Sequence, residues 1–263
     1  MTSPIIRPPA VRPGDTVRLV APSGSPKEEA AAAGIELLKG WGLNVEVSEH
    51  AFDRVGYLAG DDEVRASEFN AALRDPNVRA VMCIRGGYGA SRMVDQVDFD
   101  AARRDPKPVT GYSDITVLHT ALYARSGLVG IHGPVVNTFS AGHSPAVADE
   151  FRRALTTTDP ITIVPSDDEA TKVLTRGETA VSGRLLGGNL SLIVDAVGTP
   201  TFPGYEGAIL FCEEINEEPY RVDRILTQLR RSGALDGVAG IALGQFTDCV
   251  DEDWSWDVVD VLR

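Results

Sequence analysis

The chain has 263 residues, 43% of them hydrophobic, and a formal net charge of −13. This length and hydrophobic content suffice for a large buried core, in one large domain or two modest ones. An acidic surface of this kind repels nucleic-acid phosphates and anionic membranes, and the lack of any run of about 18 apolar residues argues against a membrane-spanning segment.

The N-terminal half alternates short apolar segments with helical ones. Residues 78–84 are nearly all apolar, which is typical of a strand covered on both faces. We predict strands over residues 16–21, 43–47, 78–84, 107–111 and 128–133, and helices over residues 25–40, 60–75 and 114–127. This alternation predicts an α/β fold with a parallel sheet, in which ligands bind at the carboxyl ends of the strands.

The pattern changes after about residue 140. One helix is predicted over residues 145–155, and a polar stretch typical of a connection follows it. A second α/β unit then begins, with strands over residues 207–214 and 237–246, a helix over 217–233 and the start of an amphipathic helix over 254–263. We therefore expect an N-terminal domain of residues 1–140, a linker of residues 141–180 and a smaller C-terminal domain of residues 181–263.

The cysteines and the N-terminus bear on the cellular compartment. The N-terminal sequence lacks the apolar region of a signal peptide. Three cysteines without paired spacing fit a reducing cytoplasm, and Cys83 and Cys212 lie in apolar runs that predict core positions. No histidine or cysteine neighbours them at ligand spacing, so we expect no metal site and no cofactor.

The stretch GYSD at residues 111–114 joins a predicted strand to a predicted helix. An alcohol acts as a nucleophile only with an adjacent base and a site for the oxyanion. A tight turn here would lift Ser113 Oγ clear of the sheet and aim the amide of Asp114 at a developing oxyanion. The same residues fit a plain helix start with Ser113 as its N-cap, and taken alone they favour that interpretation.

A glycine-rich stretch, IRGGYGASR at residues 84–92, follows the third predicted strand. Its glycines allow close approach of the backbone to a ligand, and its amides can donate to an oxyanion or a carboxylate. It matches neither the dinucleotide fingerprint nor the phosphate loop. A plain loop is the alternative interpretation.

Acidic and histidine side chains supply the remaining candidates. The strand over residues 207–214 ends in Glu213 and Glu214, so one carboxylate at the edge of a core could orient a histidine. A solvated acidic turn is the favoured alternative. Asn189 fits a helix N-cap. Of the histidines, His132 follows a strand that could approach Ser113, whereas His119 lies on a poor helix face.

Taken together, these stretches resemble one family, the serine LD-carboxypeptidases, which also include the microcin C immunity proteins. No single motif is decisive, but five in the family's order are specific. They are VAPSG at residues 20–24, IRGGYGASR at 84–92, GYSD at 111–114, LLGGN at 185–189 and ILFCEEINEEPYRVDRIL at 209–226.

The resemblance implies a flavodoxin-like N-terminal domain and a smaller C-terminal α/β domain, with the active site in the cleft between them. It implies that Ser113 is the nucleophile and that Glu213, rather than Glu214, is the triad glutamate. The oxyanion amides map to Asp114 and Gly87. Weaker candidates for substrate binding are Arg85, Tyr88, Asn189 and Arg221, of which the arginines suit a terminal carboxylate.

The triad histidine of the family has no match in this sequence. It follows the glutamate at a distance that would fall past Arg263. We expect truncation rather than an inactive relative, because the second unit breaks off inside a helix and leaves its layer incomplete.

The implied activity is hydrolysis of the L,D-peptide bond between the diamino acid and the terminal D-Ala of cytoplasmic murein tetrapeptides, by a homodimer. One alternative is cleavage of an amide between a peptide and a modified nucleotide, for which Trp254 or Trp256 could stack on the purine. The other is a non-catalytic muropeptide-binding protein that lacks the histidine base.

Overall fold

The computed structural model describes residues 4–140, 144–162, 174–175, 180–251, 253 and 255–263. The chain divides into two compact units. The first comprises Met1–Thr158 with Thr199–Pro203, and the second comprises Asp159–Gly198 with Gly204–Arg263.

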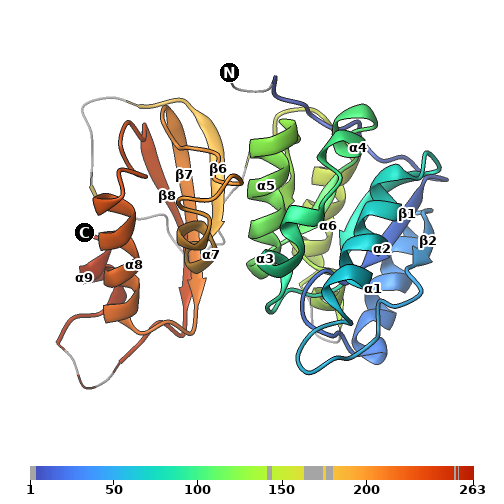
Figure 1. Cartoon of the computed structure of the whole chain (residues 1–263), viewed down its shortest axis with the longest axis horizontal. Helices are drawn as coiled ribbons and strands as arrows, with labels where there is room; N and C mark the ends of the chain where they lie inside the picture. Colours follow the sequence, from blue (N-terminus) through green and yellow to red (C-terminus); the bar gives the residue numbers. More distant parts are fainter. Residues whose placement is uncertain (1–3, 141–143, 163–173, 176–179, 252, 254) are drawn as a thin grey trace. The chain divides into compact units, whose positions relative to one another are not determined.

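A five-stranded parallel sheet forms the centre of the first unit, as the alternating pattern predicts (Figure 1). Its strand order is β2-β1-β3-β4-β5. The strands are β1 (Thr16–Val20), β2 (Asn44–Val47), β3 (Val78–Cys83), β4 (Val109–Gly111) and β5 (Ile131–His132). The last two are shorter than predicted, and Gly111 pairs in register with His132 where they end.

Helices connect these strands and cover the sheet (Figure 1). They are α1 (Glu28–Gly40), α2 (Asp62–Arg74), α3 (Ala90–Met93), α4 (Phe99–Arg104), α5 (Thr116–Ser126) and α6 (Pro145–Thr156), with short 3-10 turns η1 (Val94–Gln96), η2 (Ser113–Ile115) and η3 (Val136–Phe139). One core cluster joins Leu19 of β1 and Met82 of β3 to Leu38 of α1 and Phe151 of α6. Helix α6, which lies in the predicted linker, therefore packs into the core of the first unit.

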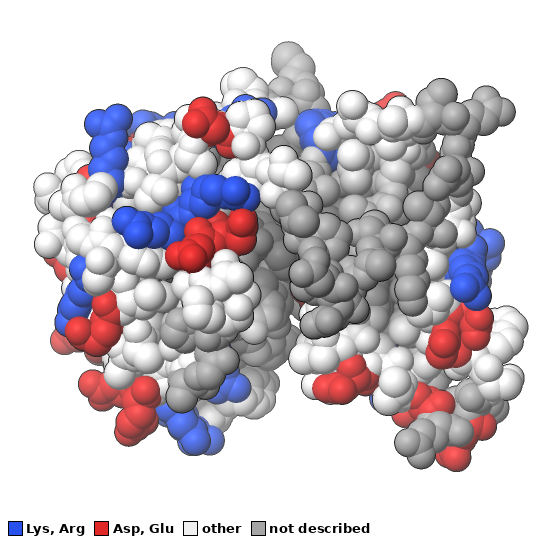
Figure 2. Space-filling view, turned by 180° about the vertical axis from the view of Figure 1, so that it is seen from behind, with Lys and Arg blue, Asp and Glu red and all other residues white. Residues whose placement is uncertain are grey.

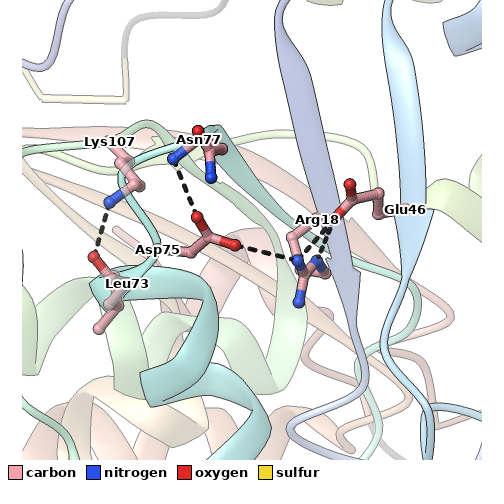
Figure 3. Close-up of polar contacts among 6 residues, drawn as sticks. All are labelled: Arg18, Glu46, Leu73, Asp75, Asn77 and Lys107. Carbon is pink, nitrogen blue, oxygen red and sulfur yellow. Dashed lines mark hydrogen bonds and ion pairs between the residues drawn. The ribbon is translucent and has the colours of Figure 1, made fainter.

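Polar side chains tie the amino-terminal ends of the sheet elements together (Figure 3). Arg18 of β1 donates to Glu46 of β2, with Nη2 2.5 Å from Oε2, and to Asp75 beyond α2 at 3.3 Å. Lys107, before β4, is buried, and its Nζ donates to the carbonyl oxygen of Leu73 at 2.6 Å. These bonds tie the carboxyl end of helix α2 to β1 and to the segment before β4.

A three-stranded parallel sheet forms the second unit, in the order β6-β7-β8. Its elements are β6 (Arg184–Asn189), α7 (Leu190–Asp195), β7 (Ala208–Ile215), α8 (Pro219–Arg231), β8 (Gly240–Thr247) and α9 (Val258–Val261). Strand β6 is absent from the predicted elements because its glycines depress strand propensity. At Gly187 a Cβ atom would lie 1.9 Å from the carbonyl oxygen of Phe211, so only glycine lets β6 approach β7 this closely.

Acidic side chains outnumber basic ones, and the face drawn in Figure 2 has no large continuous basic area among its described residues. In Figure 2 several of the described lysine and arginine side chains lie next to acidic ones on this face. No described helix is both long enough and apolar enough to cross a bilayer. The cysteines predicted for the core are buried: Cys83 is 0% and Cys212 2% exposed.

Candidate active site

Ser113 occupies a strained turn immediately after β4. Its φ is +62°, a left-handed conformation that costs a residue other than glycine about 1–2 kcal/mol. The N-cap interpretation is wrong, because Ser113 begins η2, α5 starts at Thr116, and Ile115 is the N-cap of α5. A strained serine between a parallel strand and a helix is the geometry of a nucleophile elbow.

The glycine-rich loop after β3 lies against this turn. A Cβ atom at Gly86 would be 3.1 Å from Ser113 Cβ and 3.2 Å from its Oγ, which is tighter than ordinary packing, so glycine at that position favours this close approach of the loop. Gly87 follows with φ +111°, and the amide of Gly24, after β1, donates to the carbonyl oxygen of Gly86 at 3.1 Å. Three of the motifs therefore meet at one edge of the sheet.

The side chain of Asp114 provides a further link that the sequence analysis missed. It is 1% exposed, and its Oδ2 accepts a hydrogen bond from the amide of Ala90 at 2.8 Å. Ala90 begins α3, directly after the glycine loop. The residue after the proposed nucleophile thus anchors the loop that carries Gly87. An acid beside a turn serine is also common as a helix-start residue, so the sequence offered no specific signal for this role.

Two histidines lie behind the turn. His119 Nε2 is 2.9 Å from the carbonyl oxygen of Gly111, so this nitrogen carries the proton and donates. Burial lowers the pKa of His119, which keeps the ring neutral. Burial, with a smaller contribution from His119, lowers the pKa of His132 to about 4. A base this weak abstracts a proton poorly near neutral pH, which argues against His132 as the general base.

The two glutamates at the end of β7 have different environments. Glu214 is 3% exposed and accepts hydrogen bonds from Asn189 Nδ2 at 2.7 Å, from the amide and hydroxyl of Ser191 at 2.8 and 2.7 Å, and from the amide of Ile215 at 2.9 Å. Glu213 is half-buried, and burial together with the charge of Glu214 raises its pKa to about 7. The solvated-turn interpretation is therefore wrong for both residues.

Because of this difference, Glu214 is a structural carboxylate and Glu213 is the candidate for a functional one. Four donors occupy Glu214, and the three from Asn189 and Ser191 tie the end of β7 to the start of α7. Asn189 is the N-cap of α7, as expected, and its Oδ1 accepts from the amide of Leu192 at 3.3 Å. Because both ends of this amide are engaged inside the unit, direct contact of Asn189 with a substrate is disfavoured.

The other expected substrate-binding residues are exposed. Arg85 Nη1 donates to the carbonyl oxygen of Ser25 at 2.7 Å, and Arg221 pairs with Glu218 at 3.0 Å. Tyr88 is 49% exposed, and its ring contacts that of Tyr57, 66% exposed, with centroids 5.8 Å apart. Tyr57, which the sequence analysis did not single out, thus extends the candidate surface beside the glycine loop.

Part of the proposed nucleotide-stacking pair can be located. Trp256 is 64% exposed and lines a cavity of about 300 Å³ in the second unit, with Tyr220 of α8. Trp254 lies outside the described residues. Among the described residues, no group of three or more histidine, cysteine, aspartate or glutamate side chains could hold a metal ion.

Sequence relatives cover most of the chain. A "Putative carboxypeptidase" of Streptomyces coelicolor is 43% identical over 255 residues, which span 93% of this chain and 79% of that protein. A murein tetrapeptide carboxypeptidase of Pseudomonas aeruginosa is 32% identical over 237 residues, spanning 89% of this chain and 77% of that protein.

Solved structures agree with the α/β architecture. The muramoyltetrapeptide carboxypeptidase of Oxalobacter formigenes matches with a TM-score of 0.81 and 30% identity, covering 94% of this chain and 82% of that one. The protein MccF in complex with glutamyl sulfamoyl guanosine matches with a TM-score of 0.84 and 25% identity, covering 97% and 86%.

Family models match both halves of the chain. Residues 17–133 match the LD-carboxypeptidase N-terminal domain, and residues 182–263 match the LD-carboxypeptidase C-terminal domain. The first match includes Ser113 and the glycine loop, and the second includes β6 and β7 with the two glutamates. The chain therefore belongs to the LD-carboxypeptidase family.

Proposed function

We propose that this protein is a serine-type LD-carboxypeptidase that releases the terminal D-Ala of murein tetrapeptides, with Ser113 as its nucleophile. The observation that carries the proposal is the left-handed turn at Ser113, at φ +62°, packed against Gly86. A protein does not retain such strain in a plain helix start, where a relaxed conformation serves equally well. The family resemblance and the name of the Pseudomonas aeruginosa relative support the substrate class.

In the proposed reaction, Ser113 Oγ attacks the carbonyl carbon between the diamino acid and D-Ala. The proton of the hydroxyl passes to a general base, and the carbonyl oxygen becomes an oxyanion that the amides of Gly87 and Asp114 stabilise. The C–N bond then breaks, D-Ala leaves with a proton from the same base, and a tripeptidyl ester remains on Ser113. Water hydrolyses this ester and restores the hydroxyl.

Glu213 is proposed to orient and charge-stabilise the general base. Its half-burial and its raised pKa, about 7, suit a carboxylate that gains stability when a cationic imidazolium forms beside it. The resemblance assigns the base to a histidine that has no match in this sequence. The two histidines near Ser113 are poor candidates for this role, since His119 already donates to Gly111 and the pKa of His132 is lowered to about 4.

Exposed side chains are proposed to bind the substrate. Arg85 and Arg221 are candidates for the terminal carboxylate of the peptide, because a guanidinium can bind a carboxylate through two parallel hydrogen bonds. Tyr88 offers an exposed ring beside the glycine loop. We further propose a cytoplasmic homodimer with no nucleic-acid or membrane partner.

A second candidate is hydrolysis of a peptidyl-nucleotide amide. The observation that favours it is the cavity lined by Trp256 and Tyr220, whose aromatic rings could stack on a purine. MccF, a protein of similar fold, has been solved in complex with glutamyl sulfamoyl guanosine, a compound that contains a guanosine for such a ring to stack on.

The substrate assignment is tested with three compounds and the protein expressed from its complete reading frame. We expect D-Ala release from a murein tetrapeptide, with a kcat/KM on the order of 10² higher than for the same peptide ending in L-Ala. A peptidyl-nucleotide amide serves as the third substrate. Faster cleavage of that amide, with no D-Ala release, would favour the second candidate and contradict the first.

Glu213 and Glu214 offer a matched pair of substitutions. Glu213→Gln should lower kcat by on the order of 10⁴ without destabilising the fold, because it removes a group that acts on the base. Glu214→Gln should instead destabilise the protein by about 1–3 kcal/mol, because four donors lose a charged acceptor. Steady-state kinetics and urea unfolding measure the two effects. The reverse pattern would assign the triad role to Glu214.

The raised pKa of Glu213 predicts a pH effect on stability. Between its ordinary value, 4.5, and about 7, the folded protein holds a proton that the unfolded chain has released. The free energy of unfolding should therefore fall as the pH rises through this range, and it should fall less in Glu213→Gln. Urea unfolding of both proteins from pH 4 to 8 measures this. A difference between them that does not change with pH would show that the carboxyl is not perturbed.

A further inference from the structure

We infer that Arg65, a buried residue of helix α2, is a positioning residue that holds the glycine loop and the loop after β1 in the arrangement that oxyanion binding requires. The inference rests on the proposed function, since it concerns the loop that carries Gly87. Arg65 belongs to none of the motifs through which the chain resembles its family.

The burial of Arg65 calls for a specific cause. Its side chain is 1% exposed, although arginine is almost never fully buried unless it is paired. Removing a guanidinium from water is costly, and its partners must supply compensating hydrogen bonds. Two residues of the same helix show the usual alternative: Arg74 pairs with Asp98 but stays 58% exposed, and Glu68 bonds the amide of His50 at the surface.

Arg65 bonds to two loops through one nitrogen atom. Its Nη1 donates to the carbonyl oxygen of Pro22, in the loop after β1, and to the carbonyl oxygen of Gly89, in the glycine loop, at 2.9 Å. Backbone carbonyl oxygens in loops have no partner within a regular element, so these bonds determine where the two loops lie. The side chain therefore joins two segments, at Pro22 and at Gly89, that lie more than 60 residues apart in the sequence.

Gly89 is shaped to receive this guanidinium. Its φ is +134°, and a Cβ atom there would lie 2.9 Å from Arg65 Nη1 and 2.7 Å from Leu58 Cδ2. The next residue, Ala90, donates its amide to Asp114 Oδ2 at 2.8 Å. One end of the glycine loop is thus held by Arg65 and by Asp114, the residue that follows Ser113.

The other end of the glycine loop is held by the loop after β1, which also contains Pro22. The amide of Gly24, two residues after Pro22, donates to the carbonyl oxygen of Gly86 at 3.1 Å. Gly86 is the residue that packs on Ser113. Between these two attachments lies Gly87, whose amide is proposed to donate to the oxyanion. A shift at either Pro22 or Gly89 would change the direction of that amide relative to Ser113.

Asp62 balances the buried charge and extends the network. It accepts from Arg65 Nη2 and also from Arg92, with Nε at 2.9 Å and Nη2 at 2.8 Å. The hydrogen bond from Arg92, with that from Arg65, outweighs desolvation and holds the pKa of Asp62 below its ordinary value. Arg92 belongs to α3, which begins at the end of the glycine loop. Two arginines on one carboxylate therefore secure the loop to the first turn of α2.

A positioning role makes a prediction that mere stabilisation does not. An oxyanion donor acts in the transition state, so its misalignment lowers kcat and kcat/KM together and leaves KM nearly unchanged. It should also loosen residues 84–92 without loosening the buried strand β3 that precedes them. General destabilisation would instead increase amide exchange across the whole first unit.

The test compares Arg65→Met with Arg74→Met, the same substitution at an exposed position of the same helix. In Arg65→Met we expect kcat to fall at least about 10-fold while KM changes by less than about threefold. A misaligned oxyanion donor should cost no more than a deleted one, which lowers kcat by about 10²–10³. Hydrogen exchange of peptides from residues 84–92 should rise, while exchange in β3 stays unchanged. Arg74→Met should match wild type in all of these, and Arg65→Lys should restore part of kcat.

Unchanged exchange of residues 84–92 in folded Arg65→Met would overturn the inference. If Arg65→Met does not fold, Arg65→Lys carries the same test, because a single ammonium cannot keep the geometry of the planar fork. Wild-type kcat and exchange in that variant would then overturn it. The exchange measurement needs no catalysis, so a failure of the proposed function, seen as activity retained without Ser113, is distinguishable from a failure of this inference.

Discussion

The contact between Gly86 and Ser113 is the constraint on which the rest of the site depends. The serine is held at φ +62°, and a Cβ atom at Gly86 would lie 3.1 Å from its Cβ and 3.2 Å from its Oγ, closer than side chains ordinarily pack. The attachments around this contact act on the same two segments: Gly24 and Arg65 hold the glycine loop, and the side chain of Asp114 joins that loop to the turn. Strain at the turn is thus balanced by bonds in the surrounding loops, as is usual at a functional site.

In the second unit, two adjacent glutamates at the end of β7 have different environments. Alternation along β7 buries Glu214 and leaves Glu213 partly accessible, because neighbouring residues of a strand face opposite sides. Four donors keep Glu214 satisfied, and its charge helps raise the pKa of Glu213. One glutamate therefore fixes the strand end and also tunes the reactivity of its neighbour.

Apolar periodicity predicted the strands that are long and buried, such as β3 and β7, and the helices between them. It missed β6, where the glycines that allow close approach to β7 also remove the strand signal. The order of the motifs identified Ser113, Gly87 and Glu213 as candidates. Arg65 and the Asp114 side chain were not predicted, since the loop groups that they bond are at least 24 residues away and neither spacing nor residue type indicates a long-range hydrogen bond.

The central claim is that the strained turn presents Ser113 as the nucleophile, and Ser113→Gly tests it most directly. Glycine adopts φ +62° without strain, so this variant should fold at least as stably as Ser113→Ala and its inactivity could not be ascribed to misfolding. With a murein tetrapeptide as substrate, we expect kcat/KM to fall by at least about 10³ relative to wild type. Retention of more than about one-tenth of the wild-type kcat/KM would contradict the account, because removal of a serine nucleophile lowers kcat far more than tenfold.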